Sequence, residues 1–377
     1  MTRPTLVMVT TSFPIAGDGS EAAGAFVADL AEELTSNFNI RIVAPGTTSA
    51  IERWSKHIDV YRYAAPKSPL STLKPWRMDD LAWIYKVLKG GQRATEQASE
   101  GAEHILALWA LPSGHWARTA ARRRGIDYSV WTLGSDIWSL GKIPFLRARL
   151  RSILRNARHC WSDGIELGSE TKAIAGREVV FLPSTRRIDA DARSSNRSQP
   201  PFRLLFLGRW HPNKGVDLLM QALSELRVED WAQIERITVA GGGALEPLVL
   251  SSAANLMRAG RPVEVRGYLS RDEASSAMLN ADYLLIPSRI ESIPVVFSDA
   301  MKLGLPVVSM PVGDLPTLVT SEIGVLASNV SAEAFANAMR TILAVDPARF
   351  ELQAMRERFD LGKTAQAVTA AVLPNKP

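Results

Sequence analysis

Short, β-prone apolar runs alternate with helix-like segments along the first half of the chain, and this alternation constrains the fold more than any other feature. A strand, a helix and a second strand in succession form the unit from which parallel sheets flanked by helices are built. The expected strands cover residues 5–10, 40–44, 104–109 and 128–132, and the expected helices cover 25–34 and 114–124. The first half therefore predicts an α/β domain with a parallel sheet.

The alternation stops at residues 184–201 and then starts again. That segment is polar and charged and ends in two prolines, which is typical of a linker or a long loop. Beyond it, strands are expected over 203–207, 237–240, 263–265, 283–286 and 306–310, with a turn at 208–215 and a helix over 216–226. The second half therefore predicts another domain of the same kind.

Two alternating halves predict an α/β protein of two Rossmann-like, doubly wound domains that face a central cleft. We expect an N-terminal domain at residues 1–183, a linker at 184–201, a C-terminal domain at 202–360, and a tail at 361–377 that could pack back on the N-terminal domain. The length of 377 residues agrees, because single cores rarely grow beyond about 250–300 residues. Ligands of such sheets bind outside the carboxyl ends of the strands.

The compartment is indicated by what the sequence lacks. Cys160 is its single cysteine, which excludes an internal disulfide framework and favours a reducing environment. The first residues carry no apolar run of the kind found in signal peptides, and no stretch approaches the roughly 18 consecutive apolar residues of a membrane span. We therefore expect a cytoplasmic protein.

The stretch ESIPVVFSDAM places two carboxylates, Glu291 and Asp299, eight residues apart within an apolar run. Pro294 suits the first turn of a helix, which would end at Gly304, so Glu291 precedes the helix and Asp299 lies inside it. The first N–H groups of such a helix, those of Val295 and Val296, have no helical partner and can meet an anion. A carboxylate beside them suits neutral hydroxyls, so the pattern predicts a ligand with both a phosphate and a polyol.

A second phosphate contact is predicted where the strand at 203–207 ends. Gly208 would let the chain turn, and Arg209 and Lys214 precede a helix whose N-terminus favours negative charge. This is not the P-loop pattern, since the glycine before the lysine is missing and no Ser or Thr follows it. One arginine and one lysine could neutralise a diphosphate without Mg²⁺. Two cations solvated at a turn are the alternative.

Taken together, these stretches resemble the family 4 glycosyltransferases of the GT-B fold. The resemblance is carried by FLGRWHPNKGVDLL, VAGGG, VRGYLSRDEASSAMLNADYLLIPS, ESIPVVFSDAMKLGLPVVSMPVGDLPTLV and the shorter GAFVADLAEEL near the N-terminus. It is strong over about residues 203–320 and only general before about residue 180. Both domains of the predicted fold are also implied by this family.

The resemblance assigns a role to each motif. Glu291 would hold hydroxyls of a donor sugar, Asp299 the ribose of its nucleotide, and Arg209 with Lys214 the diphosphate. Tyr268 would lie at the nucleotide base, and Gly24 in the N-terminal domain would approach the donor phosphates. The expected catalytic residues are Glu291, Arg209 and Lys214, and the expected nucleotide-sugar contacts are Asp299, Gly208, Val295, Val296, Tyr268, Gly24, Gly242 and Ser292.

The chain departs from the family pattern at three places. Asp299 stands where the family usually has the longer Glu. Trp109 and Ala110 stand where the family commonly has a histidine, with His115 a nearby substitute. TLGSD at 132–136 resembles the family's HGSD with Leu133 in place of the histidine, and it leaves Ser135 and Asp136 as candidates on the acceptor side.

The family implies a retaining hexosyltransferase that moves a sugar from a UDP- or GDP-linked donor to a glycan or lipid-linked acceptor in cell-surface polysaccharide or glycolipid synthesis. No cofactor and no metal are expected, and we interpret Asp189-Ala190-Asp191, which matches the DxD motif of metal-dependent glycosyltransferases, as accidental because no strand pattern surrounds it. The alternatives are a catalytically inactive nucleotide-sugar-binding subunit and another GT-B enzyme such as a nucleotide-sugar epimerase. Nucleic-acid binding is disfavoured, because the aromatic residues of the basic region do not form an interleaved stacking platform.

Basic residues gather at 118–158. Within this region Arg147, Arg151, Arg155 and Arg158 follow helical spacing on one side of an expected helix, with an apolar stripe on another. Such a helix could attach the protein to the anionic inner face of the plasma membrane. The alternative is a solvated helix whose apolar stripe belongs to the core.

Overall fold

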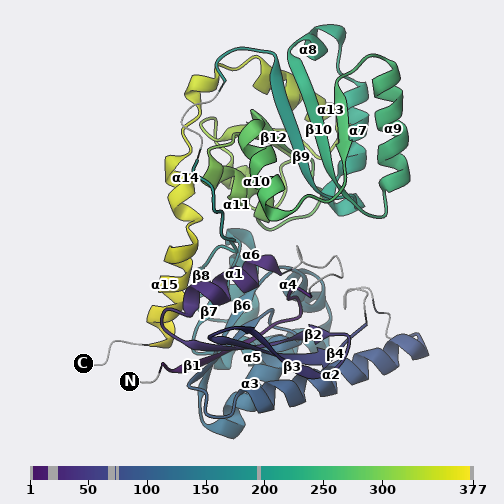
Figure 1. Cartoon of the computed structure of the whole chain (residues 1–377). Coiled ribbons are helices and arrows are strands. Elements are labelled where there is room, and N and C mark those ends of the chain that lie inside the picture. Colours follow the sequence, from purple (N-terminus) through teal and green to yellow (C-terminus); the bar gives the residue numbers. More distant parts are fainter. Residues whose placement is uncertain (1–2, 16–23, 67–72, 74–75, 193–196, 374–377) are drawn as a thin grey trace. The chain divides into compact units, whose positions relative to one another are not determined.

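The computed structural model (Figure 1) describes residues 3–15, 24–66, 73, 76–192 and 197–373. By their contacts the residues form two compact units, one of Met1–Arg187 with Leu361–Pro377 and one of Ile188–Asp360. Each unit contains a largely parallel sheet with helices between its strands. The predicted α/β fold with two Rossmann-like domains is therefore confirmed.

The N-terminal unit is built on a sheet of strand order β3-β4-β2-β1-β5-β6-β7-β8. All neighbouring strands are parallel except β3, which runs antiparallel to β4. Its strands are β1 (Thr5–Val9), β2 (Asn39–Gly46), β3 (Ala50–Ser55), β4 (Ile58–Ala64), β5 (His104–Leu108), β6 (Asp127–Thr132), β7 (Cys160–Ser162) and β8 (Val180–Phe181). Its helices are α1 (Ala25–Leu34), α2 (Met78–Ala98), α3 (Ser113–Arg124), α4 (Ser135–Trp138), α5 (Pro144–Asn156), α6 (Ile165–Ala175) and α15 (Leu361–Val372).

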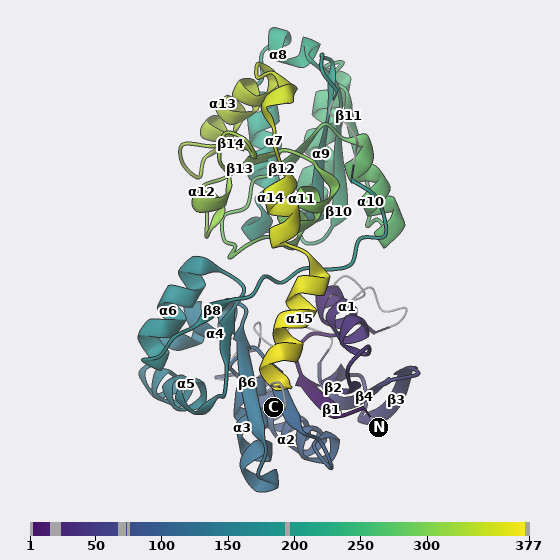
Figure 2. The same ribbon diagram turned by 90° about the vertical axis from the view of Figure 1, so that its left-hand side faces the viewer.

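Each face of this sheet is covered by a different set of helices. One core is formed with α2, α3, α5 and α6. The other is formed with α1 and α15, which lie side by side (Figure 2). Leu361, Ala365 and Val368 of α15 belong to that second core, so a helix from the far end of the sequence completes the N-terminal unit.

The C-terminal unit has a fully parallel sheet of order β11-β10-β9-β12-β13-β14. Its strands are β9 (Phe202–Arg209), β10 (Ile234–Gly242), β11 (Val263–Arg266), β12 (Tyr283–Ile286), β13 (Val307–Ser309) and β14 (Gly324–Leu326). Its helices are α7 (Val216–Ser224), α8 (Val228–Ala232), α9 (Glu246–Arg258), α10 (Arg271–Asn280), α11 (Val295–Leu303), α12 (Leu315–Leu318), α13 (Ala332–Leu343) and α14 (Gln353–Arg358). From β9 the chain adds β10 and β11 on one side of the sheet, and β12, β13 and β14 then lie on the other side. In such sheets, ligands bind at the point between β9 and β12 where the strand order reverses.

The basic helix α5 packs its apolar side inward. Leu150, Ile153 and Leu154 are fully buried in the core that α2, α3 and α6 share. The apolar stripe expected for this helix is therefore core, as in the alternative interpretation given above. Arg158 lies beyond the last residue of α5 and pairs with Asp127 at 2.5 Å. Among the described residues, no helix combines the length and the apolar character needed to cross a bilayer.

Candidate functional site

Three neighbouring strands of the C-terminal unit end at the same edge of the sheet. β9, β10 and β12 are parallel, so the segments that follow Arg209, Gly242 and Ile286 leave the sheet on one side. These are the segments that carry the sequence motifs. The edge at the change of strand order thus gathers the motifs into one site.

A glycine allows two of these segments to touch. Gly215 has a left-handed φ of 68°, and a Cβ atom on it would lie 1.8 Å from the carbonyl oxygen of Pro287. The N–H of Arg289 also donates to the carbonyl of Asn213 at 2.8 Å. The turn after β9 therefore lies directly against the loop after β12. The expectation that Gly208 makes the turn was wrong, because β9 continues through Gly208 and the chain turns at Gly215.

The close approach brings together two of the predicted site residues. Lys214 Nζ forms an ion pair with Glu291 Oε1, and the same oxygen accepts a hydrogen bond from Ser288 Oγ at 3.1 Å. The side chains of Lys214 and Glu291 are only 30% and 13% exposed, so both charges are partly shielded from water. Ser288 was not predicted, although a hydroxyl three residues before the acid was the available signal. The third predicted charge, Arg209, is exposed at the end of β9.

The helix after Glu291 begins where the sequence predicts. α11 has Pro294 as its N-cap and ends at Gly304, which has a φ of 73°. The first N–H that bonds back is that of Phe297, to the carbonyl of Pro294 at 2.9 Å. The N–H groups of Val295 and Val296 precede this first helical bond, which leaves them directed at the space before the helix.

The loop that carries Glu291 and Ser292 is held by a second tight contact. Gly313 has a φ of 53°, and a Cβ atom on it would lie 2.2 Å from the carbonyl oxygen of Glu291. Asp314 N–H donates to the carbonyl of Ser292 at 3.2 Å. This loop is thus fixed by backbone contacts on both sides, from Gly313 and from the turn at Gly215.

Asp299 occupies a different environment from Glu291. Its side chain is completely buried within α11, and its Oδ1 lies 3.5 Å from Lys302 Nζ one turn further along the helix. Asp299 is thus more deeply buried than Glu291.

Tyr268 lies over the end of β10. Its side chain is 65% exposed, yet its hydroxyl donates to the carbonyl of Gly242 at 2.8 Å. A Cβ atom on Gly242 would lie 2.7 Å from the Tyr268 ring, so only glycine allows the ring to lie there. An exposed aromatic ring held in place by its own hydroxyl can offer a face to a planar ligand.

The predicted residues of the N-terminal unit lie at the carboxyl edge of its sheet. Gly24 caps α1 with a φ of 78°, and a Cβ atom on it would lie 2.5 Å from the carbonyl oxygen of Ser12. His115 lies in the first turn of α3, and its Nδ1 is 2.6 Å from Arg149 Nη2 of α5. Burial, and then the nearby Arg149, lower the pKa of His115.

Ser135 and Asp136 follow β6 but point in opposite directions. Ser135 is exposed, whereas Asp136 is 1% exposed and its Oδ2 accepts a hydrogen bond from the N–H of Ala110 at 2.6 Å. Burial raises the pKa of Asp136 to about 6, although backbone hydrogen bonds, that of Ala110 first, act against it. The residue before Ala110, Trp109, has a left-handed φ of 68°, which is costly for a residue with a bulky side chain. Asp136 thus holds this turn through its hydrogen bond to Ala110.

The DxD match lies on exposed coil. Asp189 and Asp191 are both exposed and belong to no strand. Within the described parts of the chain, no group of three or more His, Cys, Asp or Glu residues is arranged to hold a metal ion.

The arrangement in the C-terminal unit suits an anionic, hydroxylated ligand. Two cations and the N-terminus of α11 favour negative charge, while the Glu291 carboxylate can accept hydrogen bonds from hydroxyl groups. Tyr268 adds an aromatic surface at the neighbouring strand end.

Residues 201–345 match the family model described as "Glycosyl transferases group 1". Among curated proteins, the chain is similar to the D-inositol 3-phosphate glycosyltransferase of Kineococcus radiotolerans, with 32% identity over 50% of this chain and 48% of the relative. It is also similar to the D-inositol 3-phosphate glycosyltransferase of Mycolicibacterium gilvum, with 30% identity over 64% of this chain and 55% of the relative. The chain thus spans about half the length of the curated relatives it matches.

Solved structures match over nearly the whole chain. Sucrose-phosphate synthase from Thermosynechococcus elongatus has a TM-score of 0.72 and 18% identity, and the match covers 97% of each chain. Anabaena HepE, solved in complex with UDP, has a TM-score of 0.71 and 16% identity, covering 97% of this chain and 98% of that protein. At these identities the likeness shows the fold alone.

Proposed function

We propose that the chain is a retaining glycosyltransferase of the GT-B fold, which the match of residues 201–345 to the model of the group 1 glycosyl transferases supports. It moves a hexose from a UDP- or GDP-linked donor to a hydroxyl of a glycan or lipid-linked acceptor. The observation that carries the proposal is the contact between Lys214 and Glu291 at the N-terminus of α11. One group there suits phosphate and the other suits sugar hydroxyls.

In the proposed complex, Arg209 and Lys214 contact the diphosphate and the N–H groups of Val295 and Val296 complete the anion site. Lys214 exchanges Glu291 for a phosphate oxygen, because the dianionic diphosphate is the stronger partner. Glu291 is then released to accept hydrogen bonds from the sugar. The exposed ring of Tyr268 lies at the base.

The proposed reaction needs no nucleophile from the protein. The bond between the anomeric carbon and the diphosphate oxygen breaks, and the bond from that carbon to the acceptor oxygen forms on the same face. The proton of the acceptor hydroxyl moves to the leaving diphosphate oxygen. Arg209 and Lys214 stabilise the charge that develops on this oxygen, and such stabilisation is commonly the largest catalytic contribution of a protein.

We further propose that the reaction proceeds without a metal ion, since Arg209 and Lys214 would supply two positive charges to the diphosphate. A lipid-linked acceptor would place the protein at the inner face of the plasma membrane, in cell-surface polysaccharide or glycolipid synthesis. The exposed arginines of α5 and its continuation, Arg147, Arg151, Arg155 and Arg158, would contribute attraction to anionic lipid.

The proposal is tested by thermal shift and calorimetry with UDP-, GDP-, ADP- and TDP-sugars, first in EDTA and then with Mg²⁺. Ligand at 100 times its dissociation constant should add about 2.7 kcal/mol to the free energy of unfolding. We expect one nucleotide-sugar to stabilise the protein in EDTA and Lys214→Ala to abolish the effect. Stabilisation only with Mg²⁺ would contradict the metal-free site, and no stabilisation under either condition would contradict the proposal.

The burial of Asp299 favours one second candidate, a subunit that binds a nucleotide-sugar without transferring it. An assay for the transferred sugar distinguishes a glycosyltransferase from such a binding subunit. Stabilisation by a nucleotide-sugar, together with neither transfer to membrane extracts nor hydrolysis of the donor, would favour the binding subunit.

A further inference from the structure

One side of α2 exposes a continuous line of large apolar side chains. Met78, Leu81, Tyr85 and Leu88 are 79%, 44%, 62% and 43% exposed. Their spacing of three, four and three residues places them along one stripe of the helix. We call these four residues the α2 stripe. Trp76, just before the helix, is 77% exposed.

The opposite side of α2 is fixed to the protein. Val87, Ala94 and Ala98 belong to the core. A Cβ atom on Gly91 would lie 2.4 Å from the Trp116 ring of α3, so the two helices are in close contact. The α2 stripe therefore cannot be buried by rotating the helix, because that would expose an equally apolar side.

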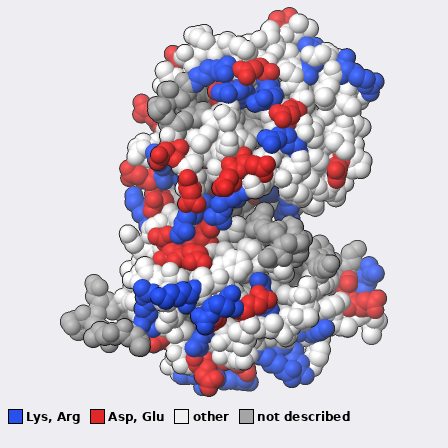
Figure 3. Space-filling model, viewed as in Figure 1, with Lys and Arg blue, Asp and Glu red and all other residues white. Residues whose placement is uncertain are grey.

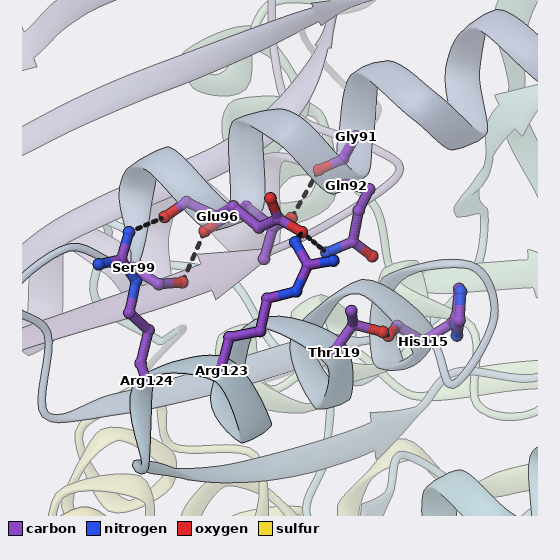
Figure 4. A network of polar contacts seen from close by, with 9 residues as sticks. Gly91, Gln92, Glu96, Ser99, His115, Thr119, Arg123 and Arg124 are labelled. Carbon is purple, nitrogen blue, oxygen red and sulfur yellow. Dashed lines mark hydrogen bonds and ion pairs between the residues drawn. The ribbon is translucent and has the colours of Figure 1, made fainter.

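Polar contacts hold the same two helices together (Figure 4). Arg123 of α3 pairs with Glu96 of α2, and Gln92 Nε2 donates to the same carboxylate at 2.9 Å. Arg124 Nη2 donates to the backbone carbonyl of Glu96 at 3.3 Å. These contacts with α3, together with those to β4 and β2 of the sheet, fix the orientation of α2 and with it the exposure of the stripe.

Cations accompany the α2 stripe. Lys86 Nζ lies 4.5 Å from the centre of the Trp83 ring, and Lys89 Nζ lies 5.5 Å from that of Tyr85. From residue 81 to residue 95 the sequence contains Lys86, Lys89 and Arg93 and no acidic residue. The two acids of α2 that come earlier, Asp79 and Asp80, lie in its first turn, where the helix dipole favours them.

The helices beside α2 extend this basic character. α3 contacts both α2 and α5, and all three cover the same face of the sheet. Exposed arginines on the two neighbours are Arg122, Arg123, Arg124, Arg147, Arg149, Arg151 and Arg155. On the side seen in Figure 3, Lys and Arg side chains lie along the lower part of the N-terminal unit, with some Asp and Glu side chains among them, where α2 and α3 lie in Figure 1.

We propose that the α2 stripe docks the N-terminal unit on an anionic lipid bilayer. The stripe enters the boundary between headgroups and acyl chains, and Lys86, Lys89 and Arg93 meet the lipid phosphates. Aromatic rings beside lysines suit this boundary, since both have an apolar body and a polar end. α5 offers less, because Leu150, Ile153 and Leu154 are buried and only Phe145, with Ile143 just before the helix, is an exposed large apolar side chain there. The inference deepens the proposed function and rests on it for its purpose, which is to bring the enzyme to a lipid-linked acceptor.

The test is co-sedimentation of the full-length chain with vesicles of phosphatidylcholine containing 30% phosphatidylglycerol, and with pure phosphatidylcholine. We expect binding to the anionic vesicles that falls at least tenfold in Leu81→Gln/Leu88→Gln. The matched control is Leu250→Gln/Met257→Gln on α9, whose side chains are 48% and 56% exposed, and it should bind as the wild type does. Equal binding by all three proteins, or no binding by the wild type, would overturn the proposal.

A label reports directly on insertion. Cys160 is buried, so Tyr85→Cys introduces one accessible thiol for an environment-sensitive fluorophore. Its emission should shift to the blue on anionic vesicles only. If the wild type instead forms a dimer that Leu81→Gln/Leu88→Gln dissociates, and the label does not respond to vesicles, the stripe is an interface with a second copy and the proposal fails.

Donor binding separates this inference from the proposed function. Leu81→Gln/Leu88→Gln should bind the nucleotide-sugar as the wild type does, because α2 belongs to the other unit. Loss of vesicle binding with intact donor binding leaves the glycosyltransferase proposal standing. If the wild type binds vesicles but no nucleotide-sugar, the membrane-docking proposal stands and the glycosyltransferase proposal fails.

Discussion

Arg289 holds Asp217 through two parallel hydrogen bonds of 2.7 Å and so joins the loop before α11 to the first turn of α7. Its Nη1 also donates to the carbonyl of Pro212 at 2.6 Å. The Arg289 guanidinium thus contacts both the turn that carries Lys214 and the helix that follows it, and it holds them close to the loop that carries Glu291. Neither residue was predicted from the sequence, because the two lie 72 positions apart.

Replacing Asp217 by Asn should weaken the site and the fold together. The Arg289 hydrogen bonds hold the pKa of Asp217 below its ordinary value, so the pair stabilises the protein above about pH 4 and this contribution is lost as the pH falls further. We expect Asp217→Asn to lower the free energy of unfolding by about 1 kcal/mol at pH 7. Urea unfolding at pH 7 and at pH 3 measures the difference, which should be smaller at the lower pH. A constant difference would show that the pair is not responsible.

The two cations should matter for turnover far more than for folding. Arg209→Ala and Lys214→Ala should each lower turnover by about 10²–10³-fold, the usual effect of removing one group that stabilises developing charge. Steady-state kinetics with the donor found by the screen measures this. Arg258→Ala on α9 is a control that should keep its activity. Near-wild-type turnover in both site variants would rule out the proposed mechanism.

Glu291→Gln should separate nucleotide binding from transfer. The neutral amide releases Lys214 and removes a negative charge beside the diphosphate, so the free nucleoside diphosphate should bind about three to five times more tightly, the size expected for a partly exposed pair. Transfer should fall, because the amide is a weaker acceptor for sugar hydroxyls. Calorimetry and kinetics on the same preparation measure the two effects. Weaker binding of the nucleotide would contradict the exchange of partners proposed for Lys214.

The close approach at Gly215 can be tested with a matched glycine. Gly260 has a similar φ of 73° but nothing within 4 Å of the position of a Cβ atom. Gly260→Ala should therefore cost only the left-handed backbone penalty of about 1–2 kcal/mol. Gly215→Ala should cost clearly more and also weaken nucleotide binding, because the Pro287 carbonyl must move away. Equal losses of thermal stability in the two variants would contradict the contact.

Asp136 should give the folded protein a dependence on pH of the opposite sign to that of Asp217. Its pKa of about 6 in the fold exceeds the ordinary value near 4, so its contribution is complete below about pH 4 and is lost as the pH rises through 6. The stability of the wild type relative to Asp136→Asn should fall by up to about 3 kcal/mol across this range. Unfolding by urea at pH 4.5 and at pH 7.5 tests this. A difference that grows with pH would contradict the burial of the carboxyl group.

The sequence predicted the elements with strong local signals. The strand at 283–286 and the helix that ends at Gly304 appear as expected, because Pro294 and Gly304 mark the limits of α11. The resemblance to glycosyltransferases agrees with the match of residues 201–345 to the group 1 glycosyl transferase model. α2 was not predicted, since Gly90 and Gly91 interrupt its pattern and apolar residues occupy two of its sides.

The geometry of the candidate site was less accessible from the sequence. The pattern indicated that Lys214 and Glu291 serve one ligand but not that they pair with each other, because pairing depends on the contact of Gly215 with Pro287. The burial of Asp136 and of Asp299 follows from side-chain length and packing, which spacing does not encode. The assigned ligand contacts stay predictions until a donor is bound.

The helix α15 has a consequence for synthesis on the ribosome. The C-terminal unit is one continuous segment and can fold as soon as it has emerged, whereas the N-terminal unit lacks Leu361, Ala365 and Val368 from its core until the last helix is made. N-terminal domains usually fold first during synthesis. Here the N-terminal unit can complete its core only after the C-terminal unit has been made. The half of the protein that is translated first is the half that is completed last.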